Sequence, residues 1–260
     1  MKLQGKVAIV TGGSKGIGLG CVRVFARRGA QVVFCSRDEQ QGRHAESELR
    51  QTGADVAFCR CDVTCEQDIV ALIQFAIDRY GRLDCMVNNA GWHPPAMTID
   101  QINTDDFESL LRLNLTSTFW GCKYAVPHLA KTRGNIINMS SAVALMGQAN
   151  AAGYVATKAG QIGLTRALAI DLAPQGIRVN AVCPAGVRTP LVEEWAASEY
   201  DPQEALRMVD RWHHLGRMAT IDEIGEVCAF LASEEASFVT GQTICPDGGA
   251  ALGYATKFNA

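Results

Sequence analysis

Residues 7–18 read VAIVTGGSKGIG, an apolar run that leads into a glycine-rich turn. The run predicts a buried strand and the segment after Gly18 has helical periodicity, so the turn lies at a strand–helix corner. Gly12 allows a tight turn, Gly16 lets the backbone approach a pyrophosphate, and Gly18 lets the helix pack closely. The start of the helix offers unpaired N–H groups to phosphates. The pattern favours a dinucleotide site formed by Gly12, Ser14, Lys15, Gly16, Ile17 and Gly18, although a plain strand–helix corner can carry the same glycines.

The rest of the chain repeats this alternation of apolar runs and amphipathic helical segments. Strands that are apolar throughout and separated by helices predict a parallel sheet covered on both faces, in a doubly wound, Rossmann-like α/β fold. No repeat or linker breaks the pattern, so residues 1–260 are predicted to form a single domain. A polar insert with aromatic residues, about 189–216, is a candidate lid. The predicted strands cover 6–13, 30–36, 54–62, 83–91, 134–141, 177–184 and 241–249, and the predicted helices 16–29, 39–52, 66–81, 104–131, 154–174 and 221–232.

Composition narrows the classes of function. Of the 260 residues, 48% are hydrophobic and the net charge is −3, so no basic surface for nucleic acid is expected. No apolar run reaches the roughly 18 residues that a membrane span needs. The N-terminus lacks the long apolar core of a signal peptide. We therefore expect a cytoplasmic protein with a small-molecule substrate and no nucleic-acid or membrane partner.

The ten cysteines point to the same compartment. With no secretory signal, those in apolar runs are expected to be free, buried thiols under reducing conditions. The local cluster Cys59, Cys61 and Cys65 has no paired His or second Cys pair, which makes it a weak zinc pattern, and no metal site is expected. The cysteines in apolar runs include Cys35, Cys85, Cys183 and Cys245.

The second predicted strand ends in VFCSRD, residues 33–38. A dinucleotide fold often has an acidic residue here that binds a ribose hydroxyl. Ser36 and Arg37 stand in its place, so a cation is available for a 2′-phosphate, and Lys15 can lie on the same side. We predict a preference for NADP(H), with Asp38 capping the next helix. In the alternative, Arg37 stacks on the adenine and NAD(H) is used.

Two polar segments follow other predicted strands, at the edge where open parallel sheets bind ligands. Asp62 and Val63 end the third strand, and the Asp62 carboxylate can accept a hydrogen bond from an adenine amino group. Asp62 is equally compatible with a structural carboxylate at a helix N-terminus. The fourth strand ends in NNAG, from which we assign Asn89, Ala90 and Gly91 to the cofactor.

Tyr154 and Lys158 share one face of a predicted helix, because they are four residues apart. A nearby ammonium group stabilises a phenolate, so we expect Lys158 to lower the pKa of Tyr154 and make it a proton donor and acceptor. Ser141, at the end of the preceding strand, can hold the same substrate oxygen. Asn114, a polar residue in an apolar helical run, can connect to Lys158 through water. Taken singly, each residue also fits an ordinary structural role.

The chain resembles the short-chain dehydrogenase/reductase family over nearly its whole length. The segments TGGSKGIG and NNAG, with Asp62, Asn114, Ser141 and a Tyr154-x3-Lys158 pair, occur in the order and spacing of that family. The resemblance implies a seven-stranded sheet, a nicotinamide cofactor, a homotetramer and a catalytic set of Asn114, Ser141, Tyr154 and Lys158. It also implies a loop that presents Pro184, Gly186, Val187 and Thr189 to the cofactor, although Ala185 interrupts the usual Pro-Gly of the family.

The substrate implied by the resemblance is a secondary alcohol or its ketone, on a 17β-hydroxysteroid or on a sugar such as L-fucose. Family positions assign His93 and Gln148 to the substrate cleft, Trp195 to the lid, and Tyr254 to a neighbouring subunit's site. An apolar, aromatic lid suits a steroid, whereas the polar residues suit a sugar. The alternatives are a 3-oxoacyl thioester reductase of the same family and a non-catalytic NADP(H) sensor.

Overall fold

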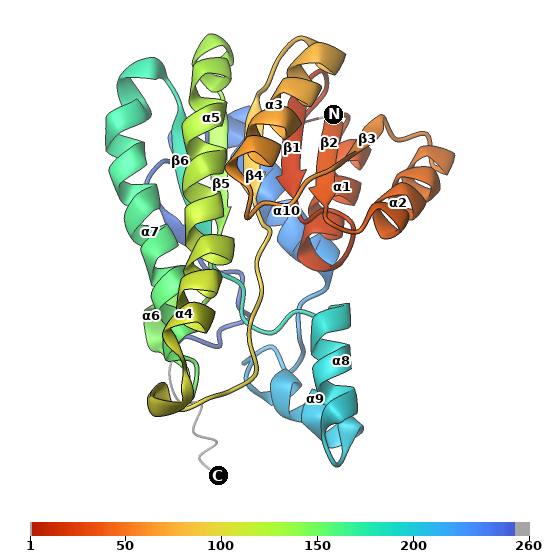
Figure 1. Cartoon of the computed structure of the whole chain (residues 1–260). Coiled ribbons are helices and arrows are strands. Elements are labelled where there is room, and N and C mark those ends of the chain that lie inside the picture. Colours follow the sequence, from red (N-terminus) through yellow and green to blue (C-terminus); the bar gives the residue numbers. More distant parts are fainter. Residues whose placement is uncertain (1, 253–260) are drawn as a thin grey trace, which may run out of the picture.

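The computed structural model describes residues 2–252, and within them the apolar runs form one seven-stranded sheet (Figure 1). The strand order is β3-β2-β1-β4-β5-β6-β7, and every neighbouring pair is parallel. The predicted doubly wound α/β fold is confirmed. The strands are β1 (Val7–Thr11), β2 (Gln31–Ser36), β3 (Val56–Arg60), β4 (Cys85–Asn88), β5 (Asn135–Met139), β6 (Arg178–Val182) and β7 (Thr243–Ile244).

Helices cover both faces of this sheet and form two cores. Val10 of β1 lies in one core and its neighbour Ile9 in the other, because alternate residues of a strand point to opposite faces. Figure 1 shows α3, α5 and α7 on the near face and α1 and α10 on the far face. The main helices are α1 (Gly16–Arg27), α2 (Glu39–Gln51), α3 (Glu66–Tyr80), α4 (Thr104–Leu111), α5 (Ser117–Thr132), α6 (Val143–Met146), α7 (Ala152–Leu172), α8 (Pro190–Ser198), α9 (Pro202–Arg211) and α10 (Ile221–Ala232).

Two predicted elements differ from the structure. The helix predicted over 104–131 is α4 and α5 joined by a π-helical turn, η2 (Arg112–Thr116). The last strand, predicted over 241–249, is only β7. Gly241, Gly248 and Gly249 have φ angles of 72°, 59° and 87°, so the backbone turns away from the extended conformation on both sides of β7.

The insert predicted at 189–216 forms the two short helices α8 and α9, which we call the lid. Both helices begin with a capping side chain followed by a proline. The side chains of Thr189 and Asp201 cap the helices by accepting hydrogen bonds from the N–H groups of Val192 and Glu204, and a proline follows each cap. Figure 1 shows the lid beyond the carboxyl ends of the strands, beside the loops that follow them.

The order of strands reverses at the centre of the sheet, because β2 lies on one side of β1 and β4 on the other. Open parallel sheets bind ligands beyond the carboxyl ends of the strands at such a switch point. The loops after β1, β4, β5 and β6 carry the predicted glycine-rich turn, the NNAG segment, Ser141 and the Pro184 loop. The fold therefore brings these segments to one edge.

All ten cysteines are free thiols. Cys35, Cys85 and Cys183 are buried as predicted, but Cys245 is only half-buried because it follows the short edge strand β7. Within residues 2–252, no group of three or more His, Cys, Asp or Glu side chains is placed to hold a metal ion. A search of the same residues found no helix with the length and apolar character to cross a membrane.

Candidate active site

The glycine-rich turn joins β1 to α1 and is tightly packed at Gly18. A Cβ atom built on Gly18 would lie 2.1 Å from the carbonyl oxygen of Gly12, so the helix packs against the turn at its closest limit. Gly12 and Gly16 have φ angles of 65° and 56°, which favour glycine. No side chain caps the start of α1, where Lys15 is the N-cap residue. The first N–H groups of α1 are thus open to an anionic ligand.

The NNAG segment after β4 clamps this turn in place. Asn89 Nδ2 donates hydrogen bonds to the carbonyl oxygens of Thr11 at 2.8 Å and Gly12 at 3.3 Å. In return, Thr11 Oγ1 accepts the N–H groups of Asn89 and Ala90, each at 2.9 Å. The Asn89 side chain is therefore committed to shaping the turn.

The predicted adenosine end of the site lies at the ends of β2 and β3. Ser36 Oγ donates to the carbonyl oxygen of Asp38 at 2.8 Å, and Asp38 caps α2 as predicted. Asp62 accepts the N–H and hydroxyl groups of Thr64. Burial acts to raise the pKa of Asp62, but the Thr64 hydrogen bonds and the charges of Arg37 and Arg60 hold it below its usual range. The exposed Arg37 thus faces the region of Asp62.

Tyr154 and Lys158 lie on α7 beside Ser141. Burial raises the pKa of Tyr154 to about 12, while a hydrogen bond with Ser141 acts in the opposite direction. The expected lowering by Lys158 is wrong for this structure. Lys158 Nζ donates to the carbonyl oxygen of Met139 at 2.7 Å and lies 5.8 Å from the centre of the Tyr154 ring. Desolvation of the phenol outweighs any stabilisation of the phenolate by the ammonium group.

Lys158 is itself 4% exposed, and burial lowers its pKa from 10.5 to about 8. The Tyr154 phenol therefore retains its proton at neutral pH, whereas the Lys158 ammonium group loses its proton near pH 8. The site thus holds a neutral phenol close to a buried ammonium group whose pKa is lowered by burial.

Asn114 lies in η2, is fully buried and holds the segment after β4. Its Oδ1 accepts the N–H group of Trp92 at 2.9 Å, and its Nδ2 donates to the carbonyl oxygen of Trp92 at 3.0 Å and to Thr157 Oγ1 at 3.1 Å. The Asn114 side chain thus joins η2 to α7 and to the segment that leads to His93.

Gln161, a residue not predicted from the sequence, lies between Asn114 and Lys158. Its Nε2 donates to the main-chain oxygen of Asn114 at 2.7 Å and to Thr118 Oγ1 at 2.8 Å, while its Oε1 accepts from Lys158 Nζ at 3.4 Å. We expected water at this place. The available signal was a polar residue three positions after Lys158, on the buried face of α7.

On the substrate side, His93 is brought to Tyr154, with ring centres 4.3 Å apart. His93 Nε2 is 3.1 Å from Gln148 Oε1, so the two predicted cleft residues meet. Trp195 lies on α8, and within residues 2–252 no hydrogen bond or ring contact joins it to His93, Gln148 or Tyr154. The predicted Tyr254 is outside the described residues.

The loop after β6 closes the site from the lid side. The carbonyl oxygen of Pro184 accepts the N–H group of Ala142, next to Ser141, at 2.9 Å. Val187 is buried and pairs with Ala219 in an isolated parallel bridge. A Cβ atom on Gly16 would lie 3.7 Å from Thr189 Cγ2, so this loop reaches the glycine-rich turn despite the inserted Ala185.

Comparisons with known proteins agree with this geometry. A family model described as "Enoyl-(Acyl carrier protein) reductase" matches residues 12–251. An L-fucose dehydrogenase of Bos taurus is 49% identical over 98% of this chain and 93% of its own length. The chain belongs to the short-chain dehydrogenase/reductase family. It is accordingly an oxidoreductase that acts on CH–OH groups.

Other members of the short-chain dehydrogenase/reductase family are also similar. A 3-oxoacyl-[acyl-carrier-protein] reductase of Chlamydia pneumoniae is 36% identical over 95% of this chain and 97% of its own length. The solved structure of the Cj0485 dehydrogenase superposes with a TM-score of 0.92 at 33% identity, over 97% of this chain and 96% of that chain. The fold and the family predicted from the sequence are confirmed.

Enzymes of this family use nicotinamide cofactors, and the residues described here fit such a group. A Cβ atom on Gly16 would meet nothing closer than Thr189 Cγ2 at 3.7 Å, so the space beside this residue is open, and the N-terminus of α1 is uncapped next to it. The Tyr154 and Lys158 pair lies at the same edge of the sheet. A dinucleotide bound along this edge would have its phosphates at α1.

Proposed function

We propose that this enzyme interconverts a secondary alcohol and its ketone on a sugar, as the name of its L-fucose dehydrogenase relatives suggests. Asn114, Ser141, Tyr154 and Lys158 are the proposed catalytic set. The observation that carries the proposal is that Ser141 and His93 both contact Tyr154, at the edge of the sheet that also carries the glycine-rich turn. In such a site, one group holds the substrate oxygen and another exchanges its proton.

A bound nicotinamide supplies the hydride acceptor or donor in this chemistry. In the reduction of a ketone, Tyr154 gives its phenolic proton to the substrate oxygen. In the reverse reaction, the phenolate form of Tyr154 takes the proton back from the alcohol. Ser141 holds that oxygen by a hydrogen bond. Lys158 holds a positive charge next to the phenol, and Asn114 fixes the segment that leads to His93.

The Tyr154→Phe variant tests the catalytic assignment, because it removes only the hydroxyl group. We expect nearly all turnover to disappear, with the Kd for the cofactor unchanged. The measurement is turnover together with a cofactor titration by tryptophan fluorescence. Turnover at the wild-type level in this variant would contradict the assignment.

The substrate class is proposed from the polar pair His93 and Gln148, which can bind sugar hydroxyl groups. A second candidate, a hydroxysteroid, is favoured by exposed apolar side chains on the lid, among them Trp195 and Met208. Turnover with L-fucose and other sugars, with 17β-hydroxysteroids and with 3-oxoacyl thioesters separates these candidates. Turnover of the thioesters alone would favour the reductase alternative, and cofactor binding with no turnover would favour a sensor.

We propose NADP(H) as the preferred cofactor. The position that binds a ribose hydroxyl in many NAD enzymes holds Ser36 here, and the exposed Arg37 and Lys15 are available to a 2′-phosphate. Around the rest of the cofactor we propose the turn residues Gly12 to Gly18, Asp62, Val63, Asn89 to Gly91, and the loop from Pro184 to Thr189. The ratio of kcat/KM for NADP and NAD tests the preference, and a clear preference for NAD contradicts it.

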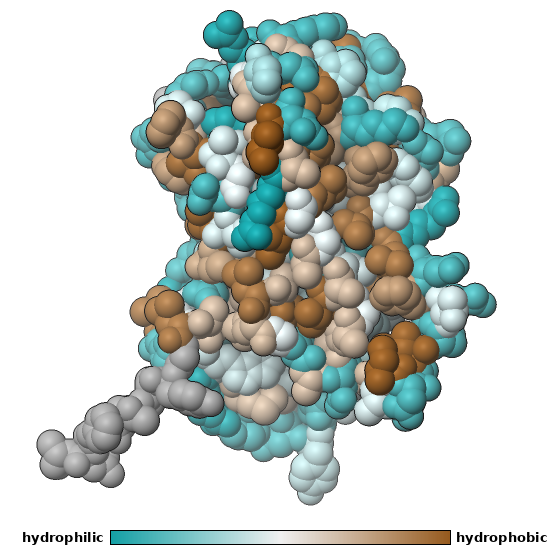
Figure 2. All heavy atoms as spheres, turned by 90° about the vertical axis from the view of Figure 1, so that its left-hand side faces the viewer, coloured by the Kyte–Doolittle hydropathy of each residue, from teal (hydrophilic) through white to brown (hydrophobic). Residues whose placement is uncertain are grey.

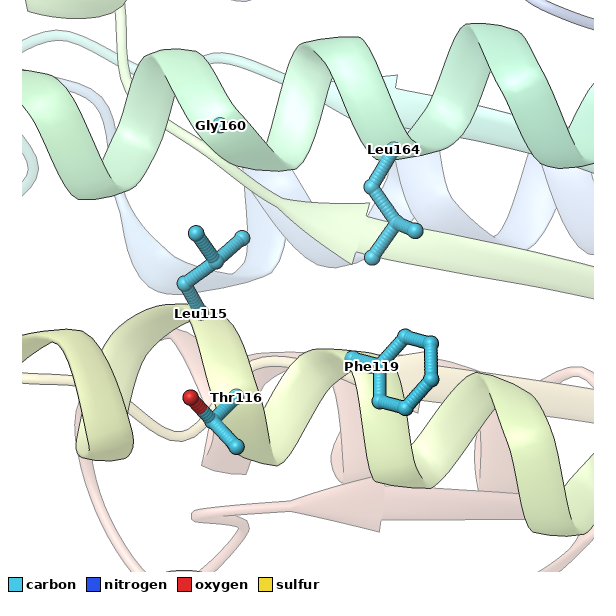
Figure 3. Close-up of a pocket in the computed structure, with 5 residues that line it drawn as sticks. All are labelled: Leu115, Thr116, Phe119, Gly160 and Leu164. Atoms are coloured by element: carbon cyan, nitrogen blue, oxygen red, sulfur yellow. The ribbon is translucent and has the colours of Figure 1, made fainter.

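We propose further that the enzyme assembles as a homotetramer of a single 260-residue domain, through the outer face of α5 and α7. A groove of about 340 Å³ lies there between the two helices, lined by Leu115, Thr116, Phe119, Gly160 and Leu164 (Figure 3). Figure 2 shows hydrophobic side chains gathered on this side of the molecule. Phe119 is 46% exposed.

The assembly is tested by light scattering after gel filtration. We expect four copies for the wild type and fewer for Phe119→Lys, while the exposed Phe238→Lys serves as the matched control on another surface. A monomeric wild type would contradict the proposal. We also propose a cytoplasmic location, which is supported by ten free thiols.

A further inference from the structure

His213 follows the lid helix α9 and is only 3% exposed. Both of its ring nitrogens have main-chain partners. Nε2 accepts the N–H group of Gly186 at 3.0 Å, and Nδ1 lies 2.9 Å from the carbonyl oxygen of Val209. An N–H group can only donate and a carbonyl oxygen can only accept, so the ring must be neutral and carry its proton on Nδ1.

The ring is wedged between the loops that follow β6 and β7. A Cβ atom on Gly186 would lie 2.6 Å from His213 Cε1, and one on Gly248 would lie 3.2 Å from His213 Cβ. Larger residues at either position would push the ring away. The carbonyl oxygen of Gly248 also accepts the N–H group of Leu215 at 3.1 Å. His213 thus joins the end of the lid to both loops.

We propose that His213 is a positioning residue whose neutral imidazole locks the Pro184–Thr189 loop to the lid, and that protonation of the ring releases this lock. The inference rests on the proposed function, in which this loop binds the cofactor. Through this lock, the Pro184–Thr189 loop, which binds the cofactor, and the lid, which covers the substrate, are held together. Protonation places an N–H group against the N–H group of Gly186 and buries a charge with no acceptor at Nε2.

Other titratable groups near the ring are already engaged. Asp210 Oδ1 accepts the N–H group of Met218, and Asp247 accepts those of Gly249 and Ala251. In the Pro184–Thr189 loop, the Nη1 atom of Arg188 lies 3.9 Å from Oε1 of Glu193. His214 carries the same kind of ring one residue away and packs against Gly249, which makes it the matched control.

The experiment compares wild type with His213→Gln, His213→Leu and the control His214→Gln. The Kd for NADP⁺ is measured by tryptophan fluorescence at about pH 8 and about pH 5.5. Amide hydrogen exchange of residues 185–189 is measured without cofactor at both values and corrected for intrinsic rates. Glutamine can accept from Gly186 and donate to Val209 but does not titrate.

We expect the Kd of wild type and of His214→Gln to rise about five- to tenfold at the lower pH, as for the loss of one net hydrogen bond, and exchange of the loop to accelerate. His213→Gln should bind like wild type at the higher pH. At the lower pH its loop exchange should not accelerate, and its Kd should rise less than that of wild type, because only the 2′-phosphate of the ligand changes its charge. His213→Leu should bind weakly at both values. Equal pH responses in wild type and His213→Gln overturn the inference, whatever the state of the leucine variant. A wild type that binds neither NADP⁺ nor NAD⁺ contradicts the proposed function instead, and the exchange measurement still decides the lock.

Discussion

Ser36 is the residue at which the proposed cofactor preference can be reversed. It is half-buried at the end of β2, with the exposed Arg37 beside it. A carboxylate here would bind the ribose 2′-hydroxyl and repel a 2′-phosphate. Ser36→Asp is therefore expected to lower the ratio of kcat/KM for NADP over NAD at least about tenfold, which corresponds to about 1.4 kcal/mol. Ser36→Asn, similar in size and uncharged, is the control, and equal ratios in both variants would refute the explanation.

Position 18 is where the glycine-rich turn is least tolerant of a side chain. A Cβ atom there would overlap the carbonyl oxygen of Gly12 and lie 2.5 Å from Asn89 Nδ2. We expect Gly18→Ala to lower the free energy of unfolding by about 2 kcal/mol or more through this clash, and to weaken cofactor binding. Gly163→Ala on α7 meets nothing within 4 Å and should stabilise by up to about 1 kcal/mol. Urea unfolding of both variants measures the contrast, and a stable Gly18→Ala would show that the turn can relax.

At the scale of elements, η2 depends on Gln161. The Gln161 amide donates to the main-chain oxygen of Asn114 and to Thr118, both of which are buried. Gln161→Leu leaves these acceptors with one partner fewer and is expected to cost about 1–3 kcal/mol of stability, together with a fall in kcat larger than any change in KM. Gln74→Leu, at an exposed position on α3, is the control. Unchanged kcat in a folded Gln161→Leu variant would assign the residue a packing role alone.

The strands, most helices and the glycine-rich turn could be predicted because their causes are local. Apolar runs such as Val7–Thr11 and the steric needs of Gly12 and Gly18 are visible in a short stretch of sequence. The π-helical turn was missed because the apolar pattern continues through it. Gln161 was missed because its partner Asn114 is distant in sequence.

The pKa of Tyr154 was predicted in the wrong direction. The spacing of Tyr154 and Lys158 is a local property, and the structure places both on α7 as expected. Their burial depends on how distant loops and helices pack around them, and this packing cannot be read from a short stretch of sequence. Desolvation then governs both groups.

For the whole molecule, Lys158 links function to stability. Burial lowers its pKa from 10.5 to about 8, so the unfolded chain holds this proton more tightly than the folded one. The contribution of Lys158 to the free energy of unfolding should therefore rise with pH between about 8 and about 10.5, and its full cost of about 3 kcal/mol applies below that window. Lys158→Met is expected to be more stable than wild type by about 1–3 kcal/mol at neutral pH, because the lost hydrogen bond to Met139 offsets part of the gain.

This prediction is measured by urea unfolding at neutral pH and near pH 10. The exposed Lys131→Met variant is the control and should match wild type at both values. A Lys158→Met variant less stable than wild type at neutral pH would mean that the hydrogen bond to Met139 outweighs the cost of burying the charge.

The short strand β7 has a consequence for aggregation. It forms one edge of the sheet with two residues, Thr243 and Ile244, and the glycines around it turn the backbone away. An edge this short offers few unpaired N–H and C=O groups to a strand of another molecule. Amyloid-like growth from this edge is therefore disfavoured.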